Sequence, residues 1–276
     1  MRTSSKFAII TTALAGAVAS AAVAAPAANA RATTSAAWYA YHGLSLSKTL
    51  AKSNQLTKQG YRPITVNVSG GQRYAAVWLK GGSPRNWGFL VGMSASGYQK
   101  RFDAALKQGG QPVSVSATGP AGSPEFAAVF EKKSGAFLTK SGLTPARFGE
   151  INRQQAAKGF ALSSVDAYGT PGDIRYVGVW TPNPGGTWYY TYGKTQQQHE
   201  KEFYAKKAKG FRPVKVAVAP DGTYSAVWRK DGVKNWAQYV GMSASGFQKR
   251  FNDLKAKGLR PVQVNAENGV YAAIWQ

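Results

Sequence analysis

Ser45 and Lys48 form a Ser-x-x-Lys pattern, in which a serine nucleophile stands one helical turn before a lysine in some acyl-enzyme hydrolases. The companion patterns Ser-Asp-Asn and Lys-Thr-Gly are absent from the chain. Ser45 also directly precedes an amphipathic segment, where a serine hydroxyl caps the free N–H groups of a helix. Capping explains Ser45 without chemistry, so we predict no catalytic residue. A serine hydrolase built around Ser45 is the alternative.

The chain has two histidines and no cysteine. A zinc site uses three or four ligands, which two histidines alone would not supply, and neither histidine belongs to a recognisable motif. His42 is expected at the end of a strand, and His199 is expected to be half-buried on a helix. The acidic residues share no repeated position, which argues against calcium sites and paired-carboxylate hydrolysis. We therefore predict no metal and no cofactor.

The elements that hold these residues are copies of one unit. All eight tryptophans fall into two columns that recur about every 50 residues, and such a period indicates a repeat architecture. The periodicity predicts that both columns are packing residues. The first column is Trp38, Trp87, Trp188 and Trp236, with Phe137 in the third copy; the second is Trp78, Trp180, Trp228 and Trp275, with Phe130 in the second copy.

The sequence pattern of each unit predicts a strand, a helix and a hairpin of two further strands. Hydroxyl residues mark the helix starts, and glycines that can adopt the left-handed cap conformation mark the helix ends. After each glycine, apolar and polar residues alternate as in a half-buried strand. The starts are Ser45, Ser94, Thr144, Thr195 and Ser243, and the glycines are Gly60, Gly109, Gly159, Gly210 and Gly258.

The fold class that follows is α+β, with five tandem β-α-β-β repeats in a single domain, 37–276. The repeats are bounded at about 37–85, 86–135, 136–186, 187–234 and 235–276. We expect the hairpin of each unit to form a three-stranded antiparallel meander with the first strand of the next unit. The strand near 38–41 should then pair with the strand near 271–275, which would close a ring of five units and remove its exposed edges.

Residues 1–30 resemble a secretory signal peptide. Arg2 and Lys6 precede an apolar stretch, and Ala28-Asn29-Ala30 is a small-x-small cleavage pattern. Residues 31–36 then form a short linker. The expected location is outside the cytoplasm, extracellular or periplasmic, with no transmembrane segment left after cleavage.

The chain is strongly basic, with 35 Lys and Arg against 12 Asp and Glu. A positive balance favours anionic partners such as wall polymers or acidic polysaccharide, while export and the absence of a recognition fold argue against nucleic acid. The alternative is an ordinary solvated helix surface. The candidate polymer-binding residues are helix cations and tyrosines of the first strands: Lys100, Arg101, Lys206, Lys207, Lys249, Arg250, Tyr39, Tyr41 and Tyr189.

The repeated words Gly43-Leu44-Ser45, Gly60-Tyr61-Arg62-Pro63 and Arg73-Tyr74-Ala75-Ala76-Val77-Trp78 resemble the bacterial tandem repeat family. They are also similar to the repeat region of fungal polyglycine hydrolases. In those enzymes the repeat region is non-catalytic and precedes a β-lactamase-like serine hydrolase domain. The resemblance covers 37–276 and therefore implies the accessory part: a secreted, non-catalytic binding or interaction module for a polymer or a protein.

Overall fold

The computed structural model describes residues 37–83 and 86–276. The expected signal peptide and linker, residues 1–36, lie outside the described residues. Five units of one strand, one helix and two further strands follow one another along the described chain, which confirms the β-α-β-β repeat. At 13 residues each, the helices of these ranges do not reach the length and apolarity that a membrane crossing needs.

Every unit contributes a first strand, a helix, an inner strand and a middle strand. The first strands are β1 (Trp38–Leu44), β4 (Trp87–Ser94), β7 (Leu138–Leu143), β10 (Thr187–Lys194) and β13 (Ala237–Met242). The helices are α1 (Leu46–Lys58), α2 (Ala95–Lys107), α3 (Pro145–Ala157), α4 (Gln196–Ala208) and α5 (Ala244–Ala256). The inner strands are β2 (Tyr61–Ser69), β5 (Gly110–Thr118), β8 (Phe160–Thr170), β11 (Arg212–Val218) and β14 (Pro261–Glu267). The middle strands are β3 (Arg73–Lys80), β6 (Glu125–Lys132), β9 (Asp173–Pro182), β12 (Tyr224–Lys230) and β15 (Val270–Trp275).

The helix boundaries follow the capping residues. In each helix the side-chain oxygen of the expected serine or threonine accepts a hydrogen bond from the backbone N–H three residues later. The expected glycine follows the last helical turn with a positive φ, between 74° and 80° in the five copies. A second glycine column, with Gly43 as its first member, also has positive φ and lies where the first strand bulges out of register. Local turn chemistry thus sets both ends of every helix.

Each unit forms its own three-stranded antiparallel sheet, with the middle strand in the centre. The predicted number of strands and their antiparallel order are confirmed, but the predicted membership is wrong. β1 pairs with β3 of its own unit, and the loops after β3, β6, β9 and β12 each lead to a separate sheet. The helix brings the chain back so that the first and inner strands flank the same middle strand. A following strand therefore finds no free edge on the middle strand.

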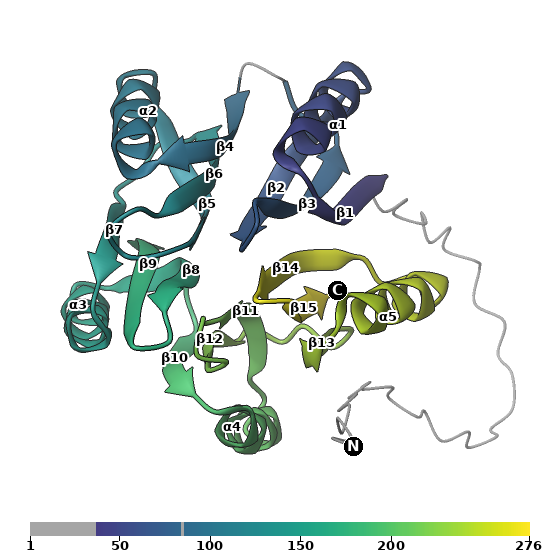
Figure 1. The fold of residues 1–276 in the computed structure, drawn as a ribbon. Coiled ribbons are helices and arrows are strands. Elements are labelled where there is room, and N and C mark those ends of the chain that lie inside the picture. The colour runs from purple at the N-terminus through teal and green to yellow at the C-terminus, as the bar shows by residue number, and fades with distance from the viewer. Residues whose placement is uncertain (1–36, 84–85) are drawn as a thin grey trace, which may run out of the picture.

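The predicted pairing of the first strand with the last is also wrong, because β15 lies between β13 and β14. The first and fifth units instead meet through side chains. Asn67 of β2 accepts a hydrogen bond from the backbone N–H of Ala266 at 3.0 Å, and the Trp38 ring packs on Phe251 of α5 at 5.5 Å between ring centroids. Figure 1 shows the five sheets around a common centre, with the inner strands toward it and the helices at the periphery.

The second tryptophan column forms the core of the units. Trp78, Trp180, Trp228 and Trp275 are completely buried between helix and sheet, as the periodicity predicts. The first column lies between units: Trp87 packs edge-on against Trp78 of the preceding unit, at 5.7 Å between ring centroids. One aromatic column therefore holds a unit together, and the other holds neighbouring units together.

The inner strands depart from the expected half-burial, because both of their faces are buried. The polar residues between the apolar ones point at the inner strand of the preceding unit and hydrogen bond to its backbone. Ser114 accepts from the N–H of Val66, and Asn265 accepts from the N–H of Val218. Side chains of one unit thus satisfy the free edge of the adjacent sheet, which an open edge would leave unpaired.

Candidate functional site

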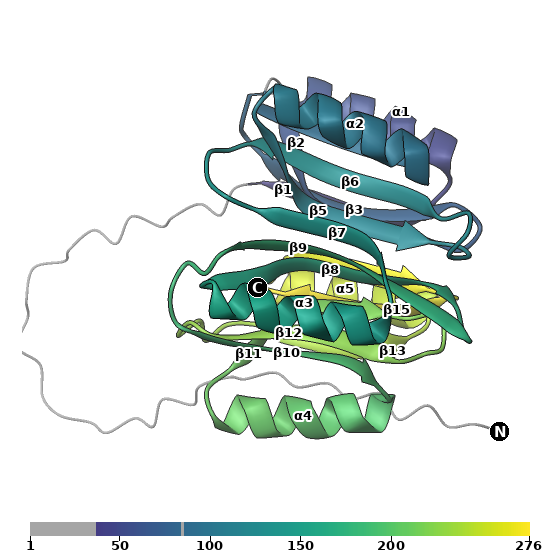
Figure 2. The same ribbon diagram turned by 90° about the vertical axis from the view of Figure 1, so that its left-hand side faces the viewer.

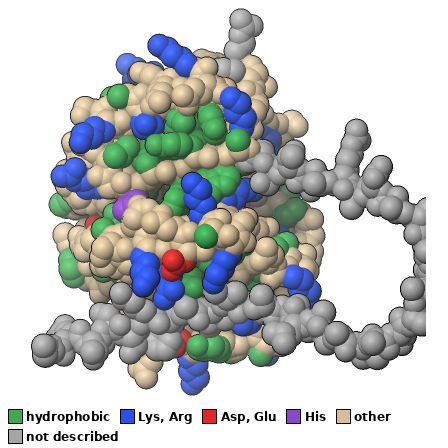
Figure 3. All heavy atoms as spheres, turned by 90° about the vertical axis from the view of Figure 1, so that its right-hand side faces the viewer, with side chains coloured by type: hydrophobic (Ala, Val, Ile, Leu, Met, Phe, Trp, Pro, Cys, Tyr) green, Lys and Arg blue, Asp and Glu red, His purple; other side chains and the backbone are tan. Residues whose placement is uncertain are grey.

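The predicted helix cations do not form one patch. Lys100 and Arg101 lie on α2, Lys206 and Lys207 on α4, and Lys249 and Arg250 on α5. Figure 1 places α2 and α5 on opposite sides of the molecule. Figure 3, which views the side that carries α1 and α5, shows Lys and Arg scattered among apolar and uncharged areas. The outer surfaces of the helices therefore offer separate basic spots.

Two of the three candidate tyrosines combine an exposed ring with a cation. Tyr39 is 38% exposed and Tyr189 is 40% exposed. The ammonium of Lys206 lies 3.2 Å from the centroid of the Tyr189 ring, and that of Lys52 lies 5.2 Å from the centroid of Tyr39. Desolvation lowers the pKa of Lys206. These pairs are cation–π contacts between a helix and the first strand of the same unit.

Tyr41 needs correction as a contact residue. Only 9% of it is exposed, and it packs with Leu56 and Trp78 in the core of the first unit. Tyr41 lies two residues after Tyr39 on the same face of β1, but at the part of the strand that α1 covers. Tyr41 is therefore a structural residue.

The structure brings together a different set of cations, at the end of the molecule where the helices finish. The inner strands lie in register: Thr65 meets Ser114, and Ser116 meets Asp166. All five units therefore run in the same direction, and Figure 2 shows the helices running side by side. One exposed lysine marks the finish of each helix, within its last residue or the cap: Lys58, Lys107, Lys158, Lys209 and Lys257.

The middle strands finish at the same end, because Lys80 pairs with Tyr61 at the start of β2. They and their loops add further exposed lysines there: Lys80, Lys132, Lys133, Lys230 and Lys234. We call these five lysines and the five helix-end lysines the basic end. Lysines at helix C-termini also stabilise the helix dipole. Lys80 of β3 shares this role, because its ammonium donates to the carbonyl oxygen of Gln59 at the end of α1.

Two carboxylates near the basic end are neutralised by arginines. Glu131 is paired with Arg62 at 2.6 Å, and Asp231 with Arg212 at 2.7 Å. Further acids lie at the opposite end, where the hairpin turns carry Glu125, Asp173, Asp221 and Glu267. The opposite end has cations of its own, including Arg175, which pairs with Asp173 at 2.7 Å. What distinguishes the basic end is therefore its number of exposed lysines. The sequence shows cations on helix faces but does not show that the units are parallel, so this collection of lysines could not be predicted from it.

The residues considered for catalysis have structural partners. The Ser45 hydroxyl accepts from the Lys48 backbone N–H at 3.4 Å, as a helix cap does. His42 lies between the first and fifth units, with Nε2 3.0 Å from Gln248 Oε1 and Nδ1 3.4 Å from the Tyr271 hydroxyl. In the part of the chain that the structure describes, no three His, Asp or Glu residues are grouped as metal ligands.

His199 is fully inside the fourth unit, more deeply than expected, with 2% of its surface exposed. Its ring packs on Tyr224 and Trp228, and its Nε2 lies 3.0 Å from the amide nitrogen of Gln238. Desolvation lowers the pKa of His199 to about 4, so the ring is neutral at physiological pH. A neutral buried imidazole that replaces a core aromatic is a packing residue.

Three titratable groups that the repeat pattern does not single out, Asp166, Glu267 and Lys215, lie where the inner strands meet. Asp166 is completely enclosed and accepts from the Asn265 amide at 2.8 Å and from the Ala117 N–H at 3.1 Å. Desolvation raises its pKa to about 6 and that of Glu267 to about 7, and lowers the pKa of Lys215 to about 8. Among the described carboxylates none forms an ion pair with Lys215, which lines a cavity of about 10 Å³. That volume is about one water molecule, too small for a substrate.

Comparison with known families identifies the repeat. Five consecutive segments match the family described as polyglycine hydrolase-like, structural repeat: 35–81, 85–133, 134–183, 185–231 and 234–276. The matches cover most of the chain, so the chain belongs to this family. The family description classes the repeat as structural.

Proposed function

From the chain's membership in this repeat family, we propose that the protein is a secreted, non-catalytic binding module. Its ligand is an anionic extracellular or envelope polymer, and the ligand rests on the basic end. The single observation that carries the proposal is the collection of exposed lysines from all five units at one end, with the nearby Glu131 and Asp231 already paired to arginines.

The geometry supports a polymer more than a small ion. The helix-end lysines come from five units around a common centre, so they present charge over a broad surface. A chain of regularly spaced anions can contact several of these lysines at once. Each contact is weak and screened by salt, but many together produce useful affinity.

Two further observations support a role without catalysis. The Ser45 hydroxyl is engaged in the helix cap, and the described histidines are held by structural contacts.

Export is supported by the sequence of residues 1–30, with its basic start and its small-x-small cleavage pattern.

The test compares two sets of substitutions with the same change of charge. The first replaces Lys58, Lys107, Lys158, Lys209 and Lys257 with glutamine, at the basic end. The matched control replaces one exposed cation on the body of each helix with glutamine: Lys48, Lys100, Arg153, Lys201 and Lys249. Binding to immobilised heparin and to polygalacturonate is measured at ~50 mM and ~500 mM salt, since screening weakens exposed charge contacts.

We expect the first set to lower affinity at least about tenfold at low salt, and the control set to lower it less than about threefold, as steering by net charge alone would do. High salt should abolish binding of the wild type. Equal losses in the two sets would show that net charge, and not the basic end, is responsible. Absence of binding to both polymers and to peptidoglycan at low salt would refute the anionic-polymer function.

A further inference from the structure

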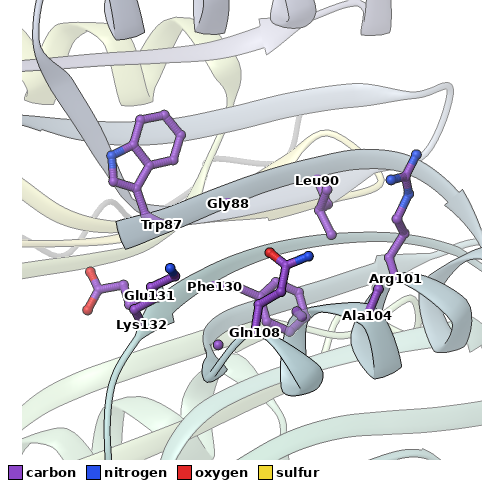
Figure 4. A pocket seen from close by; sticks show the side chains of 11 residues that line it. Trp87, Gly88, Leu90, Arg101, Ala104, Gln108, Phe130, Glu131 and Lys132 are labelled. Atoms are coloured by element: carbon purple, nitrogen blue, oxygen red, sulfur yellow. The ribbon is translucent and has the colours of Figure 1, made fainter. Parts of the chain in front are cut away.

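The second unit contains a pocket in a place that the first unit fills with its own side chains. The cavity has a volume of about 180 Å³ and lies between β4 and α2, beside the basic end. Its lining combines apolar groups with two cations and one carboxylate, which Arg62 neutralises: Gly88, Leu90, Ala105, Phe130, Arg101, Lys132 and Glu131. Figure 4 shows Gly88 on the strand between Trp87 and Leu90, with Arg101 and Gln108 on the helix side.

The pocket exists because four packing positions of this unit hold smaller residues than in the first unit. The equivalent residues there are Tyr39, Tyr41, Leu56 and Trp78. Gly88 pairs with Phe130 as Tyr39 pairs with Trp78, and Leu90 pairs with Ala128 as Tyr41 pairs with Ala76. Ala105 occupies the eleventh position of α2, as Leu56 does in α1. These four replacements remove volume, while Tyr98 and Phe102 of α2 add volume where α1 has Thr49 and Ser53, so the space that stays open is the part beside Gly88 and Ala105.

The residue at the Gly88 position shows what fits there. In the first and fourth units it is a tyrosine, Tyr39 or Tyr189, whose ring lies under a helix ammonium. In the second unit the ring is missing, and Arg101 has the helix position of Lys52 in the first unit. Lys206 of the fourth unit instead has the helix position of Ala105. An apolar cavity of ~150 Å³ accommodates a benzene ring, so the space matches one aromatic side chain.

We propose that this pocket binds a tyrosine side chain presented by an acidic segment of a partner polypeptide. The ring enters against Phe130 and Leu90, and the Arg101 guanidinium lies over it as Lys52 lies over Tyr39. Lys132 and the rest of the basic end attract the acidic residues on either side of the tyrosine. The acidic character of the partner rests on the proposed function; the ring pocket does not.

The test uses the whole exported chain and small probes. Ligand-observed NMR titration measures p-cresol, p-hydroxyphenylacetate and glucuronate, the last as a sugar-ring alternative. We expect saturable binding of p-hydroxyphenylacetate with a Kd on the order of 1–10 mM, as its small size allows. It should bind more tightly than p-cresol because of Arg101 and Lys132.

Gly88→Tyr would fill the pocket as the first and fourth units do. Gly88 has no positive φ, and an added Cβ would meet Phe130 Cβ only at 3.9 Å, so the substitution fits the backbone. It should weaken probe binding at least about tenfold, beyond the effect of a peripheral contact, and leave heparin binding unchanged. Ala105→Leu, which restores the residue of the first unit, is the second variant and should also weaken binding.

Arg101→Gln should remove the preference for the acid over p-cresol. Lys100→Gln, its exposed neighbour outside the pocket lining, should keep that preference. Probe binding that persists in Gly88→Tyr and Ala105→Leu would overturn the proposal, as would absence of saturable binding. Binding of glucuronate in preference to p-hydroxyphenylacetate would overturn it in favour of a sugar ligand. If the protein failed to bind heparin but still bound the probes, only the proposed function of the basic end would be refuted.

Discussion

Replacement of His199 by phenylalanine should change how stability depends on pH. The His199 pKa is about 4 in the folded protein, below its ordinary value of 6.5. Between these values the unfolded chain binds a proton that the folded chain excludes, so stability rises as pH increases from about 4 to 6.5. The linkage relation gives a loss of about 2 kcal/mol for the wild type between pH 7 and pH 5.

The substitution needs a partner, because His199 is hydrogen bonded to Gln238. His199→Phe alone would leave the buried amide unpaired, at a cost of about 1–3 kcal/mol. In the fifth unit the residue equivalent to His199 is Phe247. The residue equivalent to Gln238 is Ala40 of the first unit, which packs against the same core cluster as Phe247. The double variant His199→Phe, Gln238→Ala therefore copies an arrangement that this fold already contains.

Urea unfolding at pH 5, 6 and 7 measures the effect. We expect the double variant to be within about 1 kcal/mol of wild type at pH 7, as volume-conserving core changes are. At pH 5 its free energy of unfolding relative to wild type should have increased by about 2 kcal/mol, because the variant lacks the histidine whose protonation destabilises the wild type. Gln238→Ala alone is the control and should keep the wild-type slope. If the free energy of unfolding changed with pH in the same way for the wild type and the double variant, the assignment of a depressed pKa to His199 would be refuted.

Three further outcomes follow from burial and charge. Trp228→Ala should cost about 3–5 kcal/mol in chemical unfolding, whereas exposed Tyr189→Ala should cost less than about 1 kcal/mol; equal costs would contradict the two assignments of burial. Lys215→Met should remove an increase in stability of the wild type as pH rises from 8 toward 10.5, because the folded protein releases this proton first. Glu267→Gln should remove a decrease in stability as pH rises from 4.5 to 7, since the buried carboxyl holds its proton longer than the unfolded one; an unchanged melting-temperature profile would show that Glu267 is not desolvated.

The sequence predicts the elements of this fold well because local chemistry sets them. Ser243 and Gly258, for example, bound α5 through a cap and a left-handed turn that need no knowledge of the rest of the chain. The membership of the sheets is different, since the loop after β3 could lead either to a hairpin partner or to a new sheet. Strand alternation gives faces but does not say which edges meet.

The candidate site was harder to predict for the same reason. Lys58 and Lys257 are far apart in the sequence, and only the parallel arrangement of the units places them at the same end. Tyr41 and Tyr39 differ by two positions, yet helix packing buries one and leaves the other exposed. Gly88 lines a pocket together with Leu90 and Ala105, which are also smaller than their counterparts in the first unit, and this combination is not evident from any one position.

The hydrogen bonds between inner strands affect how this protein could evolve. Ser116 accepts from Val68, Asn265 accepts from Val218, and Asn67 of the first unit accepts from Ala266 of the last. Loss of one unit by recombination would leave backbone donors without acceptors on one side of the gap and side-chain acceptors without donors on the other, and an added unit would separate Asn67 from Ala266. Open solenoids lengthen or shorten by whole copies at little cost. Here a change in the number of copies would require matching changes in the side chains that join them.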